Sequence, residues 1–258
     1  MEARGPALVK LLDQSFVARV RQAAALRLLR RLHRVTHRLP ISPRAVRKAR
    51  VLVVAPHMDD EVIGPGGTLA LHQQLGSHVS AVFCAAGGDE EQDRTRKAEA
   101  RAAADFLGFA RVDWLDFPDG QISRHEPALA DRLAEIIREV EPEEIFCPHF
   151  ADHHRDHSAV TMSLCRAMEQ TGFRGEVWSY EVWSPLWPNV AVDITPVADR
   201  KRQAIALHAS QVAGLHYIEG ILGLNSYRGL RVYVRHAEAY FVASAKEFVA
   251  LARQMNRL

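Results

Sequence analysis

The pattern of hydrophobic and polar positions changes its period near residue 50. Between Leu8 and Val35 the apolar residues recur at spacings of three, four or eight, which is the helical period. From residue 51 onward, short runs rich in β-branched residues alternate with helical patterns, which predicts an α/β fold: a Rossmann-like, three-layer arrangement with a mainly parallel sheet and helices on both faces. The predicted strands are 51–55, 79–85, 112–115 and 145–147, and the predicted helices between and after them are 65–75, 93–107, 127–140 and about 158–171.

The remainder of the chain is less regular. Residues 39–43 have the proline-rich composition of a linker. We therefore divide the chain into a helical arm, residues 1–49, and a catalytic domain, residues 50–258. In the second half of that domain the pattern predicts shorter strands at 176–182, 190–194 and 239–243, with helices near 197–207 and 245–254.

Charge separates the arm from the domain. Residues 1–50 hold thirteen Lys/Arg and two Asp/Glu, a formal charge of +11, so the remaining residues carry −9 of the net +2. A basic amphipathic helix can contact a membrane surface. We expect instead that the arm packs on its own domain or on a neighbouring subunit; nucleic acid is not expected, whereas membrane contact and a homo-oligomer stay open.

The amino-acid composition limits which class of protein this chain can be. A hydrophobic share of 48% and a charged share of 25% are typical of a globular chain. The three cysteines lie in apolar or helical patterns without Cys-x-x-Cys spacing, which favours a reducing compartment. The N-terminal segment is interrupted by arginines, unlike a secretory signal, and we expect a cytoplasmic protein.

Two predicted strands end in clusters of polar residues. The first runs into His57, Asp59, Asp60 and Glu61, and the fourth runs into the segment 149–157, which is rich in histidine and aspartate. Ligand sites of parallel sheets lie beyond the carboxyl ends of the strands, so both clusters open into the same crevice.

Together these clusters predict a metal site. His57 and Asp60 can converge on one cation, and His154 or His157 can add a second imidazole, leaving a position for water as in a catalytic zinc centre. His149 and His153 stay open as alternative ligands. Zinc suits these ligands, although another divalent metal could occupy them.

The two motifs resemble those of the LmbE-like, or PIG-L-type, N-deacetylases. Members of that family carry Ala-His-Pro-Asp-Asp-Glu after a strand and a later Asp-x-His-Pro-Asp-His. Here the first motif stands at 55–61, followed by glycines at 64, 66 and 67, and the second at 152–157. Smaller echoes include 96–99, 115–120, the His-x-Ser-Gln at 208–211, and 238–241. The resemblance covers about residues 50–244.

This resemblance implies roles for individual residues. The metal ligands would be His57, Asp60 and His157, and Asp59 would be the general base. His154 would act on the tetrahedral intermediate, with Asp156 orienting it. Arg96 and Asp119 would face substrate hydroxyls.

Two residues depart from the family pattern. Met58 and Arg155 stand where many members have proline, which puts substrate preference in doubt rather than metal binding.

The sequence therefore predicts a zinc-dependent hydrolase that removes an N-acetyl or other N-acyl group from an amino sugar or sugar conjugate by attack of metal-activated water. Two alternative functions stay open. The first is a metal-dependent hydrolase that acts on an ester or phosphoester. The second is a nucleotide-binding or scaffolding module whose basic arm binds a membrane or nucleic acid.

Trp178, Trp183 and Trp187 are expected to pack in the core or an interface, with stacking on a sugar as the alternative. Substrate, oligomeric state, metal identity and the role of the arm are not fixed by these patterns.

Overall fold

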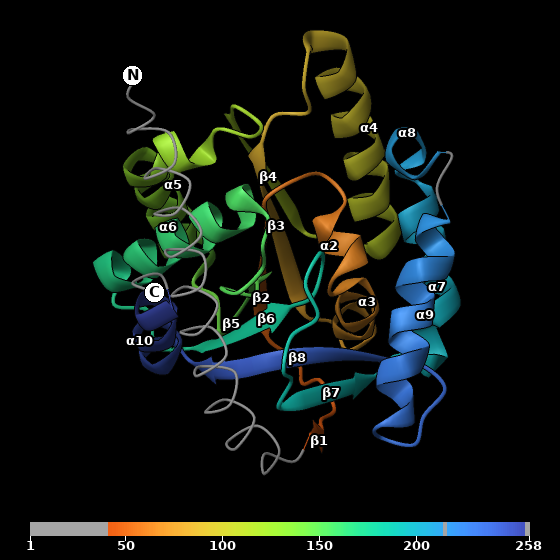
Figure 1. Cartoon of the computed structure of the whole chain (residues 1–258). Coiled ribbons are helices and arrows are strands. Elements are labelled where there is room, and N and C mark those ends of the chain that lie inside the picture. The colour runs from red at the N-terminus through yellow and green to blue at the C-terminus, as the bar shows by residue number, and fades with distance from the viewer. Residues whose placement is uncertain (1–40, 214–215, 256–258) are drawn as a thin grey trace, which may run out of the picture. The chain divides into compact units, whose positions relative to one another are not determined.

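The computed structural model describes residues 41–213 and 216–255 (Figure 1). The expectations for the arm up to residue 40 lie outside this described part. Its elements are β1 (Ser42–Pro43), β2 (Arg50–Ala55), α2 (Asp60–Ile63), α3 (Gly66–Gln74), β3 (His78–Ala85), α4 (Glu90–Leu107), β4 (Arg111–Phe117), η1 (Ile122–Arg124), α5 (Glu126–Val140), β5 (Glu144–Pro148), α6 (Arg155–Thr171), β6 (Glu176–Tyr180), β7 (Val190–Asp193), η2 (Thr195–Val197), α7 (Ala198–Ala206), α8 (Ala209–Val212), α9 (Tyr217–Leu230), β8 (Ala237–Ser244) and α10 (Ala245–Met255).

One mixed sheet of eight strands organises the described chain. Its order is β1-β7-β8-β6-β5-β2-β3-β4. All neighbouring strands pair in parallel except β8, which is antiparallel to both β6 and β7. The predicted fold class, a mainly parallel sheet with helices on both faces, is confirmed. β2 and β5 lie side by side in its centre, so their carboxyl ends open at the same edge.

Two apolar cores, one on each face, hold the layers together. α5, α6 and α10 cover one face, and α3, α4, α7 and α9 cover the other (Figure 1). The central strand β2 is buried on both faces from Val51 to Ala55, which explains its unbroken apolar run. Within the described residues, no helix combines the length and the apolar character needed to cross a membrane.

Gly64 and Gly67, after β2, allow close packing. A Cβ on Gly64 would collide with the ring of Tyr180. Next to them, Glu238 accepts hydrogen bonds from the amides of Gly67 and Thr68 at 2.7 Å each and pairs with the buried Lys201 at 2.6 Å. These bonds fix the start of α3 beside the edge where β2 ends.

Two features of the chain differ from the prediction. Helix α9 was not predicted, because Gly220, Gly223 and Gly229 interrupt its apolar pattern and lower its helix propensity. Strand β1 lies in the segment that reads as a linker, and it pairs with β7. Residues 41–49, which the predicted boundary assigns to the arm, therefore belong to the same compact unit as the sheet.

Candidate metal centre

The turn after β2 folds around its own carboxylates. Oδ2 of Asp60 accepts a hydrogen bond from the amide of His57 at 2.9 Å, and Oε2 of Glu61 accepts one from the amide of Asp59 at 3.0 Å. Asp59 has φ 153° and ψ −23°, a backbone conformation that residues other than glycine rarely adopt. Such strain persists only where surrounding contacts hold it, and it is concentrated at functional sites.

The second cluster lies in the loop between β5 and α6. Oδ1 of Asp152 accepts a hydrogen bond from the amide of His154 at 2.9 Å, and Oδ2 lies 3.5 Å from Nδ1 of His157. His157 is fully buried in the first turn of α6. Asp152 thus holds the loop and faces the imidazole that α6 directs inward.

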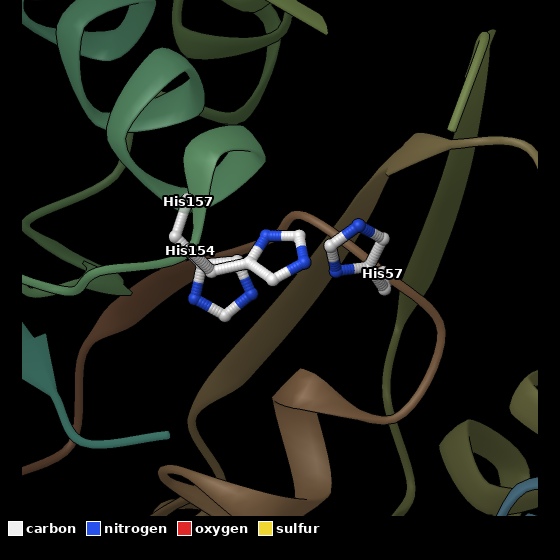
Figure 2. Close-up of side chains that lie close together, drawn as sticks. All are labelled: His57, His154 and His157. Carbon is white, nitrogen blue, oxygen red and sulfur yellow. The ribbon is translucent and has the colours of Figure 1, made fainter. Parts of the chain in front are cut away.

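The structure brings the two clusters together. Figure 2 shows the rings of His57, His154 and His157 gathered from the β2 turn and the start of α6, with ring centroids 4.8 to 5.4 Å apart. Oδ2 of Asp60 lies 3.4 Å from Nδ1 of His57 and 3.3 Å from Nε2 of His157. Ligands that bind one zinc ion tetrahedrally at about 2.0–2.1 Å are separated by about 3.4 Å. These spacings fit a zinc site.

Unpaired nitrogen atoms support the same fit. Nδ1 and Nε2 of His157 and Nδ1 of His154 are buried and have no hydrogen-bond partner among the described residues. Buried polar atoms without partners are costly, and a cation beside Asp60 would satisfy Nε2 of His157, while Nδ1 of the same ring faces Asp152. One nitrogen from each of His57, His154 and His157 lies within 4.8 Å of the others, so these three imidazoles form a candidate ligand group, in which His154 stands in place of the predicted ligand Asp60.

The charges around the site attract a cation. Burial opposes the charged form of His157, but Asp60 and Asp152 outweigh it and raise the pKa of His157 to about 9. Although burial disfavours its charge, Asp60 is held well below its usual pKa by His157 and His57. A metal ion could take the place of the protons on these imidazoles.

Asp59 occupies a different electrostatic position. Burial, reinforced by repulsion from Asp60, raises the pKa of Asp59 to about 8. Its Oδ2 atom lies 3.5 Å from the hydroxyl of Tyr217. A carboxyl with a pKa near neutrality can take up and release a proton, as a general base must.

Asp156 and Asp119 both face His57. Nε2 of His57 lies 3.4 Å from Oδ2 of Asp156 and 3.3 Å from Oδ1 of Asp119. Asp156 also accepts hydrogen bonds from the amides of Gly120 and Ile122. The expected contact of Asp156 with His154 is replaced by this contact with His57. His57, Asp119 and Asp156 form a second group that could hold a cation, so the structure leaves two arrangements around one imidazole.

Other predicted residues lie farther from the three imidazoles. The ring of His149 packs against Phe150 and Phe241, and His153 contacts Ser184. Arg96 lies close enough to lower the pKa of Asp119, after the larger effect of His57.

Sequence reasoning left several neighbours of the site without a role. Glu61 contacts the buried His208, and Gln211 donates a hydrogen bond to the carbonyl of Met58. The match to the family at 208–211 was the only sequence feature that pointed to His208 and Gln211. Tyr217 carried no signal, because it follows a stretch without a clear period.

Comparison with known proteins gives a consistent picture. A family model described as GlcNAc-PI de-N-acetylase (PIG-L) matches residues 52–168. An uncharacterized deacetylase, YaiS, of Escherichia coli is 30% identical over 135 residues, which cover 49% of this chain and 73% of the relative. A 4-oxalmesaconate hydratase of Pseudomonas putida is 29% identical over 191 residues, 62% of this chain and 73% of the relative. The structure of N,N'-diacetylchitobiose deacetylase from Pyrococcus horikoshii superimposes with a TM-score of 0.67 at 24% identity, covering 76% of this chain and 85% of the other.

Proposed function

The chain belongs to the PIG-L (LmbE-like) family of deacetylases, and from that premise we propose that it removes the N-acetyl group from an amino sugar or sugar conjugate in a metal-dependent hydrolysis. The observation that carries the proposal is the gathering of the His57, His154 and His157 imidazoles, with Oδ2 of Asp60 3.4 Å from His57 and 3.3 Å from His157, beside the Asp59 carboxyl, whose pKa is raised to about 8. Zinc is the proposed metal because its preferred ligands are imidazole and carboxylate groups in this geometry.

The proposed ligands are His57, Asp60 and His157. A zinc ion held there would supply a Lewis acid that polarises the amide carbonyl and acidifies water. Nε2 of His57 faces Asp119 and Asp156, so these carboxylates would orient the ring while Nδ1 faces Asp60. Carboxylates that hold a ligating imidazole in this way fix its orientation and raise its basicity.

Asp59 would act as the general base. Its carboxylate would take the proton of the attacking water, while the neighbouring carboxylate of Asp60 accepts a hydrogen bond from the amide of His57. His154 is the proposed acid on the other side of the reacting amide. Burial, together with repulsion from His157 and His57, lowers the pKa of His154, so this imidazole would first take up a proton and then pass it to the departing amine nitrogen, while Asp59 holds the proton of the attacking water.

A direct assay tests this function. The purified protein, loaded with zinc, should release free amine from N-acetylglucosamine derivatives, and removal of the metal by a chelator should stop the reaction. Failure of the zinc-loaded protein to release amine from any N-acetylated sugar conjugate would refute the proposal.

A second candidate is addition of water to an unsaturated acid, because one relative is a hydratase. The local charges favour a neutral substrate instead. Three carboxylates with lowered pKa values, those of Asp60, Asp119 and Asp156, lie around the three imidazoles and would repel an acid. Measuring water addition to an unsaturated dicarboxylate beside amine release would distinguish the two reactions.

The arm is proposed to be auxiliary to this reaction. Residues 1–40 hold nine Lys/Arg and two Asp/Glu, a formal charge of +7, which suits association with an anionic surface or a neighbouring subunit. A chain that begins at residue 41 should keep hydrolase activity and lose any such association. We also propose that the protein is cytoplasmic and that zinc is its metal.

A further inference from the structure

Trp183 is a large aromatic side chain that stays 48% exposed on the loop between β6 and β7. Large apolar side chains on a surface are unremarkable when scattered singly, but those beside a catalytic centre mark binding sites. The position and support of this indole therefore decide whether it has a role.

Buried groups hold the loop in place from behind. Glu181 and Arg228 form an ion pair in which both side chains are buried. Arg228 also donates a hydrogen bond to the carbonyl of Leu186 at 3.0 Å, and Glu181 accepts one from the amide of Leu186 at 2.9 Å. These bonds fasten both ends of the segment that carries Trp183, so the indole is presented by a fixed loop.

The backbone and Ser184 of this loop form hydrogen bonds with the segment that carries the candidate metal centre. The amide of Trp183 donates to Oδ2 of Asp152 at 3.2 Å, the same oxygen that lies 3.5 Å from His157. Oγ of Ser184 lies 2.7 Å from Nδ1 of His153 and accepts a hydrogen bond from its amide at 3.1 Å. The Trp183 backbone is therefore one carboxylate away from a proposed metal ligand.

The indole itself lies beside the proposed base. Its ring makes an edge contact with the ring of Tyr217, with centroids 6.1 Å apart, and the Tyr217 hydroxyl lies 3.5 Å from Oδ2 of Asp59. Only one aromatic ring separates Trp183 from Asp59. A substrate whose acetamide group reaches Asp59 would extend its next unit toward this indole.

We infer that Trp183 forms one wall of a second subsite, which binds the sugar ring attached to the N-acetylated sugar by stacking against it. This inference rests on the proposed function, because it names the part of the substrate that lies beyond the reacting group. A pyranose ring has a face of C–H groups that packs against an aromatic ring and a rim of hydroxyls. Ser184 and His153, adjacent to the indole, offer hydrogen-bonding partners for such hydroxyls.

Two substrates that differ by one sugar ring test the subsite. With the zinc-loaded full chain, kcat/KM is measured for N-acetylglucosamine and for N,N'-diacetylchitobiose. Trp183→Ala should lower the value for the disaccharide about tenfold, mainly through KM, and should change the value for the monosaccharide less than twofold. Trp183→Phe, which keeps an aromatic face, should recover most of the loss.

Trp187→Ala is the matched control, since Trp187 lies on the same loop and is exposed to a similar extent, 50% against 48% for Trp183. It should leave both substrates unaffected. Equal losses on both substrates in Trp183→Ala, or no loss on either, would overturn the subsite.

Binding separates this inference from the proposed function. If the wild-type protein deacetylates neither of these two sugars, the subsite is tested without catalysis, by calorimetric titration of the protein with N,N'-diacetylchitobiose. A dissociation constant about tenfold larger for Trp183→Ala than for wild type would support it. Equal constants, or no binding to the wild-type protein, would overturn it.

Discussion

Nε2 of His208 lies 3.0 Å from Oε1 of Glu61, and neither side chain has any exposed surface. The other oxygen of Glu61 accepts the amide of Asp59, and Gln211, one turn beyond His208, donates to the carbonyl of Met58. Glu61 and Gln211 therefore hold the N–H and the C=O of one peptide group, the one between Met58 and Asp59 that precedes the strained backbone of Asp59.

Removing one partner of this pair should destabilise the fold. His208→Ala leaves Glu61 buried without its partner, and such changes cost about 3–5 kcal/mol. Urea unfolding followed by circular dichroism measures the loss. His78→Ala, at an exposed position on β3, should change the free energy of unfolding by less than about 0.5 kcal/mol. A loss below about 1 kcal/mol in His208→Ala would contradict the pairing.

Asp59 and Asp60 are adjacent but should respond differently to the same substitution. Asp59→Asn removes the proposed base, so kcat should fall about 100-fold to 10,000-fold while the metal content stays near that of wild type. Asp60→Asn removes a proposed ligand, so both metal content and activity should fall. Elemental analysis of the purified variants, beside amine release, tests the assignment. Loss of metal in Asp59→Asn would assign that residue to the ligand set instead.

Asp152 should control metal affinity without being a ligand. Its Oδ2 atom faces Nδ1 of His157, and partners of this kind typically contribute 10-fold to 100-fold to affinity. Asp152→Asn is expected to weaken zinc binding by about that factor in competition with a chelator of known affinity. Asp131→Asn, on the exposed side of α5, is the matched control. Unchanged affinity in Asp152→Asn would mean that the 3.5 Å contact does not act on the metal.

The buried imidazole of His72, which is not part of the metal centre, should make the stability of the fold depend on pH. Burial, with a smaller effect of the Arg47 charge, lowers the pKa of His72 to about 4, and its neighbour Glu144 has a raised pKa because it is buried. The unfolded chain has an ordinary histidine pKa of about 6.5 and binds a proton first as pH falls. Stability is therefore full above about pH 6.5 and declines toward pH 4, by up to about 3 kcal/mol from this group.

The test compares unfolding of the wild type and of His72→Gln between pH 7 and 4.5. The variant should be less stable at neutral pH, because the imidazole hydrogen bond with Ser77 is lost, and its stability should fall less steeply with pH. Identical slopes for the two proteins would contradict the assignment to His72.

The central part of the fold could be predicted because its physical signals are local. β2 and β5 are continuous apolar runs followed at once by histidine and aspartate, and parallel pairing brings such ends together. Both the sheet and the meeting of His57 with His157 follow from that pattern.

What the sequence did not predict depends on tertiary contacts. α9 contains three glycines, so its apolar residues form no clear stripe, and it is stabilised by packing against α7 and β8. The partner of Asp156 was not predictable, because its contact with His57 joins residues 99 positions apart and exists only in the folded chain. The placement of Trp183 beside Tyr217 depends on a loop conformation set by Arg228, which lies 45 positions further along the chain.

Adjacent strands β2 and β5 carry clusters whose outermost proposed ligands, His57 and His157, are one hundred positions apart in the chain. An ion bound by both would close a loop that contains β3, α4, β4, α5 and β5, acting as a cross-link between distant segments. Closing a long loop restricts the unfolded chain, so such a cross-link favours the folded state. Metal release should then be coupled to the opening of this half of the sheet, and exchange of the ion should slow as the fold is stabilised.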